Sequence, residues 1–340
     1  MRFIHAAVPH NSFNRRGKSP PAGRCVIQTE NFLIAVRCVT PMFLVLCVGL
    51  LLRRAHIVPD DTFHHLSTIS FRALLPCLLF YNVYSADLSS AVQPRLLLFL
   101  VLWVLGWFGF NYALYTTTVP DPRRRGAYIQ NSFRTNIAVI GVSLAQSMMG
   151  QDGLAALAFA ISVVVPLYNV LAVITLETCR GGAMDPKKTL SGILRNPLII
   201  GCFLGILCLL SGLRLPSPVE QAVKNLGNAG SVTTLLALGA SFEFSGVAKN
   251  RKAIIRCTLH RLVTAPLLAF AAAILLGFRG DALGVILVCL ASPTASTAYP
   301  MALACDSDHE LTAQLVVITS LLCSFTLFCW IFFLKQLGFL

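Results

Sequence analysis

The sequence predicts an all-α polytopic membrane protein, and three observations carry this prediction. Hydrophobic residues make up 56% of the chain and charged residues only 12%, whereas soluble domains carry roughly 25% charged residues. Apolar segments of about 20 residues, the length that a bilayer requires of a helix, recur along most of the chain. Lysine and arginine gather in every second connection between these segments. We therefore expect about ten transmembrane helices.

The first 31 residues differ from the rest. They hold five basic residues against Glu30, together with Pro20-Pro21, and no apolar core long enough for a signal peptide. We expect residues 1–31 to be a basic, disordered extension. The first repeat should then occupy 32–176, a cytoplasmic linker 177–190, and the second repeat 191–340.

Each predicted span rests on its own stretch of sequence. Spans one, three and six follow from hydropathy alone, and the others also carry polar residues or prolines. In chain order the ten spans are 32–52, 63–84, 95–115, 127–149, 153–176, 191–211, 223–244, 253–277, 281–304 and 311–334.

The basic residues predict how these spans are oriented, because cytoplasmic loops carry an excess of lysine and arginine. The connections after spans one, three, five and seven are basic, and the alternate ones hold few such residues. Odd-numbered connections should therefore be cytoplasmic and both termini extracytoplasmic, in a multi-pass protein of the plasma membrane. The basic N-terminal extension argues for the opposite orientation, but the loops hold more charges. The basic loop residues are Arg53, Arg54, Arg123, Arg124, Arg125, Arg180, Lys187, Lys188, Arg195, Lys249, Arg251, Lys252 and Arg256.

Composition also argues against several classes of function. The net charge of +13 reflects orientation in the bilayer, since no basic stripe interleaved with aromatic residues indicates nucleic-acid binding. The twelve cysteines form no CxxC pair and no zinc spacing, so we expect no metal and no cofactor. An HExxH motif and paired intramembrane aspartates are both missing, which disfavours an intramembrane enzyme.

The most informative stretch is 291–306, ASPTASTAYPMALACD. Within an apolar region it holds two prolines, Pro293 and Pro300, and four hydroxyl residues. Proline frees a backbone carbonyl, which in hydrocarbon must find a partner inside the protein or in a water-filled cavity. The stretch therefore indicates either a broken helix that lines a substrate site or a proline kink repaired by neighbouring hydroxyls.

A weak internal repeat favours the broken helix. The sequence from Asn131 and the sequence from Ala291 each show a polar, small-residue helix, a short loop with aspartate, and an aliphatic helix. The offset between such pairs is about 155–160 residues, which gives five spans per half. An odd number of spans inverts the second half relative to the first, and inverted repeats with paired interrupted helices are typical of secondary transporters.

Several segments also resemble the auxin efflux carrier family, which includes plant auxin carriers and bacterial malate or malonate permeases. The resemblance runs in register from about residue 32 to the C-terminus. Its motifs are GLLLRR from Gly49, LSTISFRALLPCLLFYNVYSADL from Leu66, FRTNIAVIG from Phe133, VPLYNVLAV from Val165, LRNPLIIGCFLG from Leu194, LLALGASFE from Leu235 and SPTASTAYPMA from Ser292.

This resemblance implies ten helices in two inverted repeats, with helices four and nine unwound where they cross. It also implies a homodimer and an asparagine of helix four, here Asn136, that helps to hold the carboxylate of an organic anion. Many members have a Gly-x-Pro after that asparagine, where this chain has Gly141-Val142-Ser143. A break in helix four would then depend on Gly141 alone.

The candidate substrate-binding residues each have a structural alternative. Asn136 could bind a carboxylate beside the positive end of a half-helix, or could be a satisfied interhelical hydrogen-bonder. Arg134 could be functional, because a charge inside the membrane is costly and is seldom kept without a role, yet it could equally snorkel to the cytoplasmic surface. For Arg72 and Arg261 we favour the interpretation that they snorkel. Asn169 could face the same cavity or satisfy the carbonyl that Pro166 frees. The remaining candidates are Gly141, Ser143, Pro293, Thr294, Ser296 and Thr297.

The sequence therefore favours a secondary carrier of a small organic anion such as a carboxylate, working by alternating access around the crossing of helices four and nine. The alternative is a non-transporting membrane sensor that kept the carrier fold. No aspartate or glutamate lies deep in a predicted span, which disfavours coupling through a buried carboxylate. Backbone carbonyls at a helix break could still hold a coupling cation.

Overall fold

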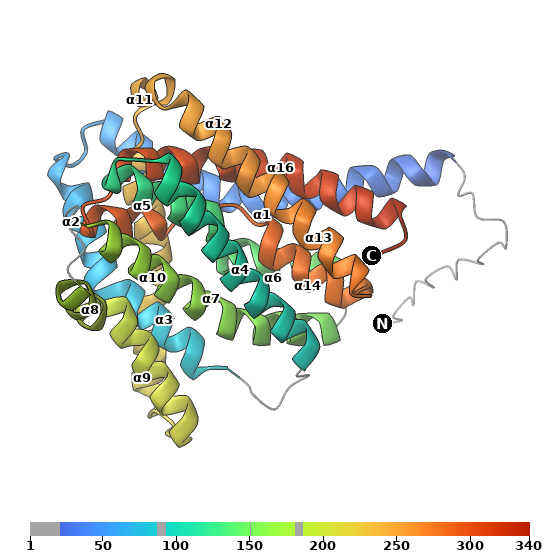
Figure 1. Ribbon diagram of the computed structural model, residues 1–340, viewed down its shortest axis with the longest axis horizontal. Coiled ribbons are helices and arrows are strands. Elements are labelled where there is room, and N and C mark those ends of the chain that lie inside the picture. Colours follow the sequence, from blue (N-terminus) through green and yellow to red (C-terminus); the bar gives the residue numbers. More distant parts are fainter. Residues whose placement is uncertain (1–20, 87–92, 150, 181–185) are drawn as a thin grey trace, which may run out of the picture.

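The computed structural model describes residues 21–86, 93–149, 151–180 and 186–340, and these are helical or in short connections (Figure 1). The first half contains α1 (Pro21–Arg54), α2 (Asp61–Ile69), the π-helical turn η1 (Ser70–Leu74), α3 (Leu75–Tyr84), α4 (Pro94–Thr118), α5 (Pro122–Phe133), α6 (Ile137–Met148) and α7 (Gln151–Cys179). The all-α fold class is confirmed. Helix α1 begins at Pro21, before the predicted residue 32, and residues 1–20 lie outside the described part of the chain.

The second half begins at residue 186. It contains α8 (Pro186–Arg195), α9 (Pro197–Ser211), α10 (Ser217–Ala240), α11 (Phe244–Lys249), α12 (Arg251–Leu259), the π-helical turn η2 (His260–Thr264), α13 (Ala265–Leu275), α14 (Gly280–Ala291), α15 (Ala298–Ala304) and α16 (His309–Gln336). In both halves a π-helical turn joins two α-helices into one long element.

Five described helices are long and apolar enough to cross a membrane, and a sixth arises if the pair Thr189–Arg195 and Pro197–Ser211, bent by 58°, counts as one span. This number is smaller than the ten predicted spans, and part of the difference has a visible cause in the described residues. Two of the predicted spans are divided into half-helices of 12 and 12 residues and of 12 and 7 residues, and no half-helix alone reaches the roughly 20 residues that a bilayer requires. Helix α10 opens with the polar sequence SPVEQAVKN.

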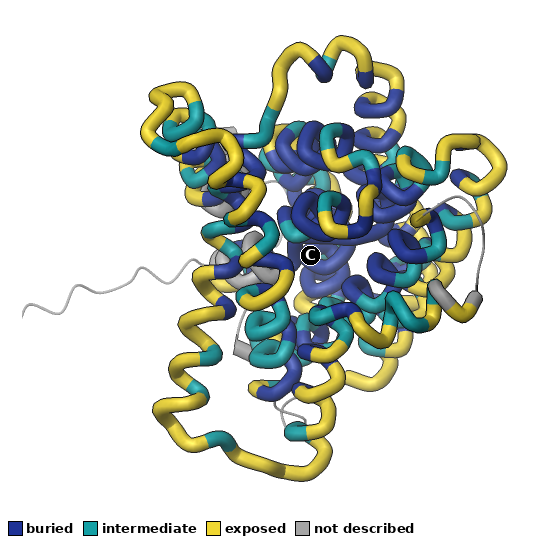
Figure 2. The backbone as a smooth tube through the Cα atoms, turned by 90° about the vertical axis from the view of Figure 1, so that its left-hand side faces the viewer, coloured by how far each residue is buried: buried dark blue, intermediate teal, exposed yellow. Residues whose placement is uncertain are grey.

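The helices pack as two groups, which meet most extensively where α1 packs against α16. The first, which we call the panel bundle, consists of α1, α2, η1, α3, α9 and α10, with α10 against α1 and α3, and α9 against α3. The second, the crossover bundle, consists of α4 to α7 and α12 to α16, with α5 and α14 both against α7. Figure 1 shows α3 beside α9, and Figure 2 shows buried backbone gathered in the interior with exposed segments around it.

Glycines allow the panel helices to approach one another closely. A Cβ added at Gly49 of α1 would lie 2.1 Å from the carbonyl oxygen of Leu236, and one added at Gly239 of α10 would lie 2.0 Å from that of Leu46. The two contacts are reciprocal, since each glycine lies three residues from the residue that the other contacts. Small residues that let backbones approach are the usual means of packing helices in membranes, so α1 and α10 pack in close backbone contact.

Candidate functional site

Two broken helices cross in the crossover bundle. Helix α5 ends at Phe133 and α6 begins at Ile137, while α14 ends at Ala291 and α15 begins at Ala298. Between them Thr135 and Thr294 form an antiparallel β-bridge, and the backbone N–H of Asn136 donates to the carbonyl of Pro293 over 2.8 Å. Backbone groups that leave one helix are therefore satisfied by the other break, as hydrocarbon surroundings require.

The break in the fourth predicted span lies at residues 134–136, so its expected dependence on Gly141 is wrong. Gly141 lies inside α6, where an added Cβ would meet Cγ1 of Val288 at 2.9 Å. Its role there is close packing of α6 against α14. The hydroxyl of Thr135 donates to the carbonyl of Cys289 over 3.0 Å, so cross-helix hydrogen bonds at the threonine hold the fourth span open without a proline.

A small pocket of about 50 Å³ lies beside this crossing. It sits between the two bundles, because α3, α9 and α10 form one wall and the two breaks and α7 form the other. Its polar lining consists of Asn82, Arg134, Thr135, Asn136, Tyr168, Asn169, Ser231, Ser296 and Thr297. Five of the predicted binding residues are among them, namely Arg134, Asn136, Asn169, Ser296 and Thr297.

Arg134 is buried in this pocket, with 3% of its surface exposed, and does not snorkel. Its Nη2 donates to Oδ1 of Asn169 and to Oγ1 of Thr297, each over 2.5 Å, and its Nη1 lies 2.7 Å from the sulfur of Met301. All of these acceptors are neutral. In the described chain no carboxylate pairs with Arg134, and a buried charge without a counter-charge is costly.

Two side-chain amides in the pocket add N–H donors that have weak hydrogen-bond partners or none among the described residues. The Nδ2 of Asn136 contacts only the sulfur of Met42, at 3.4 Å, and thioether sulfur is a weak acceptor. The Nδ2 of Asn82, on the opposite wall, is buried and has no hydrogen-bond partner among the described residues. Native proteins pair nearly all such groups, so an unpaired donor in a pocket is a feature that a ligand could satisfy.

The pocket is electropositive. None of its described lining residues is acidic, and α6 begins at the crossing with Asn136 as its N-cap, whose side chain makes no capping bond. The first N–H groups of α6 therefore lack a side-chain cap, and the positive end of its dipole lies at the pocket. Such a site suits an anion.

The other predicted residues lie near the crossing but do not line the pocket. Pro293 accepts the Asn136 N–H, and Thr294 is fully buried with its hydroxyl on the carbonyl of Asn131 at 3.1 Å. The side chain of Ser143 lies outside the described residues. The polar lining residues that were not predicted are Asn82, Thr135, Tyr168 and Ser231. Asn82 interrupts an apolar helix, which is a signal that could have identified it, whereas Ser231 lies among other small and polar residues of α10.

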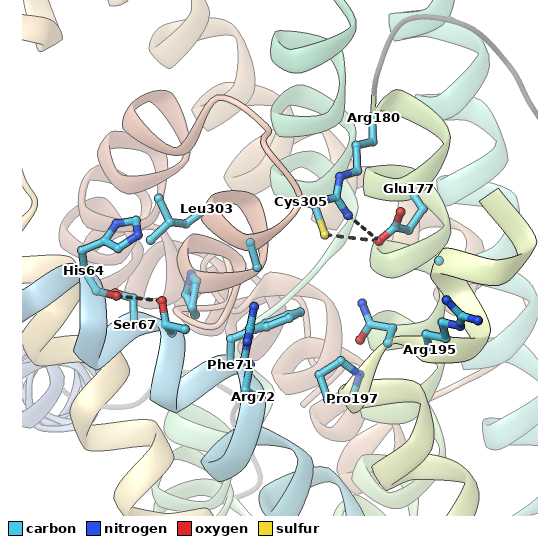
Figure 3. A pocket seen from close by; sticks show the side chains of 15 residues that line it. His64, Ser67, Phe71, Arg72, Glu177, Arg180, Arg195, Pro197, Leu303 and Cys305 are labelled. Carbon is cyan, nitrogen blue, oxygen red and sulfur yellow. Dashed lines mark hydrogen bonds and ion pairs between the residues drawn. The ribbon is translucent and has the colours of Figure 1, made fainter. Parts of the chain in front are cut away.

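A larger cavity of about 670 Å³ lies at the end predicted to be cytoplasmic (Figure 3). Three arginines line it from three elements: Arg72 from η1, Arg180 after α7 and Arg195 from α8. The carboxylate of Glu177 faces Arg180 at 3.5 Å, so basic groups outnumber acidic ones in the described lining. In Figure 3 Arg72 extends into the space between the walls. Arg72 is exposed.

The two cavities follow one another along the same elements. The large cavity is lined by Phe71, Pro197 and Pro300, and the small pocket by Leu75, Leu198 and Thr297 on the same three stretches of chain. The three pairs, Phe71 with Leu75, Pro197 with Leu198 and Pro300 with Thr297, are each separated by about one helical turn or less. The large cavity therefore leads from the molecular surface towards the crossing.

The connection between α15 and α16 forms part of this cavity wall. Burial, and next to it the Glu177 carboxylate, raise the pKa of the Cys305 thiol to about 12, so this cysteine is a neutral thiol at physiological pH. Within the described residues no three His, Cys, Asp or Glu side chains are placed as ligands of one metal ion.

Comparison with known proteins identifies relatives along nearly the whole chain. The family model described as "Membrane transport protein" matches residues 34–331. An uncharacterized transporter of Methanocaldococcus jannaschii is 22% identical over 298 residues, which cover 85% of this chain and 95% of the relative. An uncharacterized transporter of Methanothermobacter thermautotrophicus is 21% identical over 310 residues, covering 88% and 98% of the two chains.

Proposed function

Because this chain belongs to the membrane transport protein family, we propose that it is a secondary carrier of a small organic anion such as a carboxylate. The resemblance of its motifs to the auxin efflux carriers is confirmed by the family match, and the chain is a transporter rather than an enzyme. It has several helices able to span a bilayer, as expected of a multi-pass membrane protein.

The observation that carries the proposal is the state of Arg134. Its guanidinium is buried beside the crossing, holds its charge at any physiological pH, and contacts only neutral acceptors. A substrate carboxylate would supply the missing counter-charge. It would also find donors from Asn136 on the crossover bundle and Asn82 on the panel bundle, so one ligand would contact both bundles.

The arrangement of the helices supports two inverted repeats. The starts of α10, of α12, of α14 and of α16 follow those of α2, of α4, of α5 and of α7 by 156, 157, 158 and 158 residues. Thr135 and Thr294, which pair at the crossing, differ by 159 in residue number. These values fall within the predicted offset of about 155–160 residues, and they support a substrate site where the interrupted helices of the two repeats meet.

Alternating access would follow from movement of one bundle against the other. The large cavity gives access from the predicted cytoplasmic side, while the pocket of about 50 Å³ is far below the roughly 300 Å³ of typical ligand sites. Binding would therefore separate the bundles at the pocket. Membrane potential favours export of an anion from a negative interior.

A thermal-shift screen of the purified full chain against small carboxylates tests this function. A ligand that binds only the native state raises its melting temperature as occupancy rises. We expect at least one carboxylate to stabilise the wild type, and Asn136→Ala to lose that response. The matched control is Asn225→Ala, because the Asn225 amide is exposed on α10 and bonds only Gln221. Equal shifts in Asn136→Ala and wild type, or no shift with any carboxylate, would contradict the assignment.

A further inference from the structure

The C-terminal end of the half-helix α14 has its carbonyls satisfied one by one. The Ser292 hydroxyl donates to Val288 over 2.6 Å, Thr135 to Cys289 over 3.0 Å, and the Cys323 thiol lies 3.8 Å from the Ala291 carbonyl. The remaining carbonyl, that of Leu290, receives a charged donor. Free carbonyls at such an end, with the negative end of the helix dipole, are the groups that hold sodium in carriers with broken helices.

That charged donor is Arg261, in the π-helical turn η2. Its Nη2 donates to the carbonyls of Leu290 over 3.1 Å and Ser292 over 2.8 Å. The residue is only 1% exposed, so the expectation that it snorkels to the surface is wrong. Its Nε is buried without a partner among the described residues, and no described carboxylate pairs with it. The guanidinium thus donates its hydrogen bonds to the carbonyls at the helix end rather than to an acidic residue.

The first repeat closes the equivalent end with a neutral group. The indole Nε1 of Trp107, on α4, donates to the carbonyl of Ser132 over 3.2 Å. Ser132 and Leu290 hold matching places near the ends of α5 and α14, and Trp107 and Arg261 lie on the matching helices of the two repeats. A neutral donor is therefore sufficient to close such an end. The positive charge at the second end is a separate feature that needs its own explanation.

We propose that Arg261 is a tethered cation that occupies the position where a coupling sodium ion would otherwise bind at the α14 terminus. The inference about transport rests on the proposed carrier function, and the inference about the cation position does not. Carbonyls that already accept hydrogen bonds from a guanidinium are not free to coordinate a dissociable ion. The carrier consequently binds and moves its anion without sodium, with Arg261 as a positioning residue for the break at 292–297.

Exchange of the cation tests this proposal without any knowledge of the substrate. Melting temperatures of the purified full chain are compared in sodium chloride and in N-methylglucamine chloride of equal ionic strength. We expect the wild type to melt at the same temperature in both. In Arg261→Met, which removes the charge and keeps an apolar stem, we expect a lower melting temperature that sodium or guanidinium ion raises in a saturable manner. A cavity that merely lost packing would respond to neither ion.

Two further variants keep the test decisive. Arg256→Met removes an exposed arginine from the same long helix and should respond to neither cation. Arg261→Lys retains a charge and should stay insensitive to sodium, and it replaces the methionine variant if the latter does not fold. Sodium-dependent stabilisation of the wild type would overturn the proposal, as would a folded Arg261→Met that no cation stabilises or an Arg261→Lys that gains a sodium response. Loss of carboxylate binding with these cation responses intact would instead contradict the carrier function alone.

Discussion

Replacing Arg134 by glutamine should weaken anion binding strongly. Arg134 supplies the positive charge among the described residues that line the small pocket at the crossing, which we call the crossover pocket. Glutamine keeps an amide that can donate one hydrogen bond, but it loses the charge and the forked geometry of the guanidinium. The substrate carboxylate would then be buried at the crossing with only neutral donors around it.

The magnitude follows from the burial of the pair. Truncating one partner of a buried, hydrogen-bonded charge pair costs about 2–5 kcal/mol, which corresponds to a factor of about 30 to about 4,000 in Kd, since 1.4 kcal/mol is tenfold. The residual amide donor places the expected loss near about 100-fold. Without ligand, the hydrogen bonds lost to Asn169 and Thr297 are opposed by relief of the guanidinium's desolvation. The fold should therefore be perturbed far less than binding.

Titration calorimetry of the purified carrier with the carboxylate that stabilises the wild type measures this effect. Arg125→Gln is the control, because Arg125 lies on the same helix and donates to the carbonyls of Val119 and Pro120 away from the pocket. A folded Arg134→Gln protein that binds the carboxylate within threefold of the wild type would refute the role of Arg134 as counter-charge.

Four further outcomes are expected. Asn82→Leu removes a buried donor that has no described partner, so it should weaken carboxylate binding about 10-fold while leaving the melting temperature unchanged or higher; a lower melting temperature with unchanged affinity would contradict this. Gly239→Ala should destabilise the protein by about 1–3 kcal/mol through overpacking against Leu46. Gly106→Ala, with open space around it, should be neutral or stabilising, and equal denaturation curves for the two variants would show that the contact between α1 and α10 is not tight. Arg72→Gln should slow anion uptake a few-fold at low salt and have no effect at high salt, because rim charges act on association; a salt-independent loss would argue for direct binding instead. Cys305, whose pKa is raised to about 12, should resist maleimide at pH 7 in the folded protein and react after denaturation, and rapid native labelling would contradict its burial.

Sequence patterns predicted the features that depend on local composition. The prolines and hydroxyls at 292–300 predicted the break between α14 and α15, and a charge inside an apolar region marked Arg134 as a candidate, whereas the role of Asn136 followed from the resemblance to a known family. The first two signals are local, because proline changes what the backbone can do at its own position and an intramembrane charge is costly wherever it lies.

The features that depend on tertiary contacts were predicted poorly. Gly141 carries the residue type expected at a break, yet the break lies at Thr135, where cross-helix hydrogen bonds to Cys289 and Thr294 replace helical ones. Arg261 resembled a snorkelling arginine because hydropathy cannot reveal that its helix faces the end of another half-helix. Asn82 interrupts an apolar helix, but nothing local indicates that it faces a pocket, since the opposite wall comes from residues far away in sequence.

Movement of the carboxylate across a membrane is the most direct test of the central claim that the crossover pocket belongs to an anion carrier. Proteoliposomes preloaded with the unlabelled carboxylate are given the labelled one outside, and counterflow is followed in wild type, Asn136→Ala and Asn225→Ala. We expect saturable accumulation in the wild type and in Asn225→Ala, and loss of accumulation in Asn136→Ala. Stabilisation of the wild type by the carboxylate without any counterflow would contradict the carrier and favour a membrane sensor that kept the carrier fold.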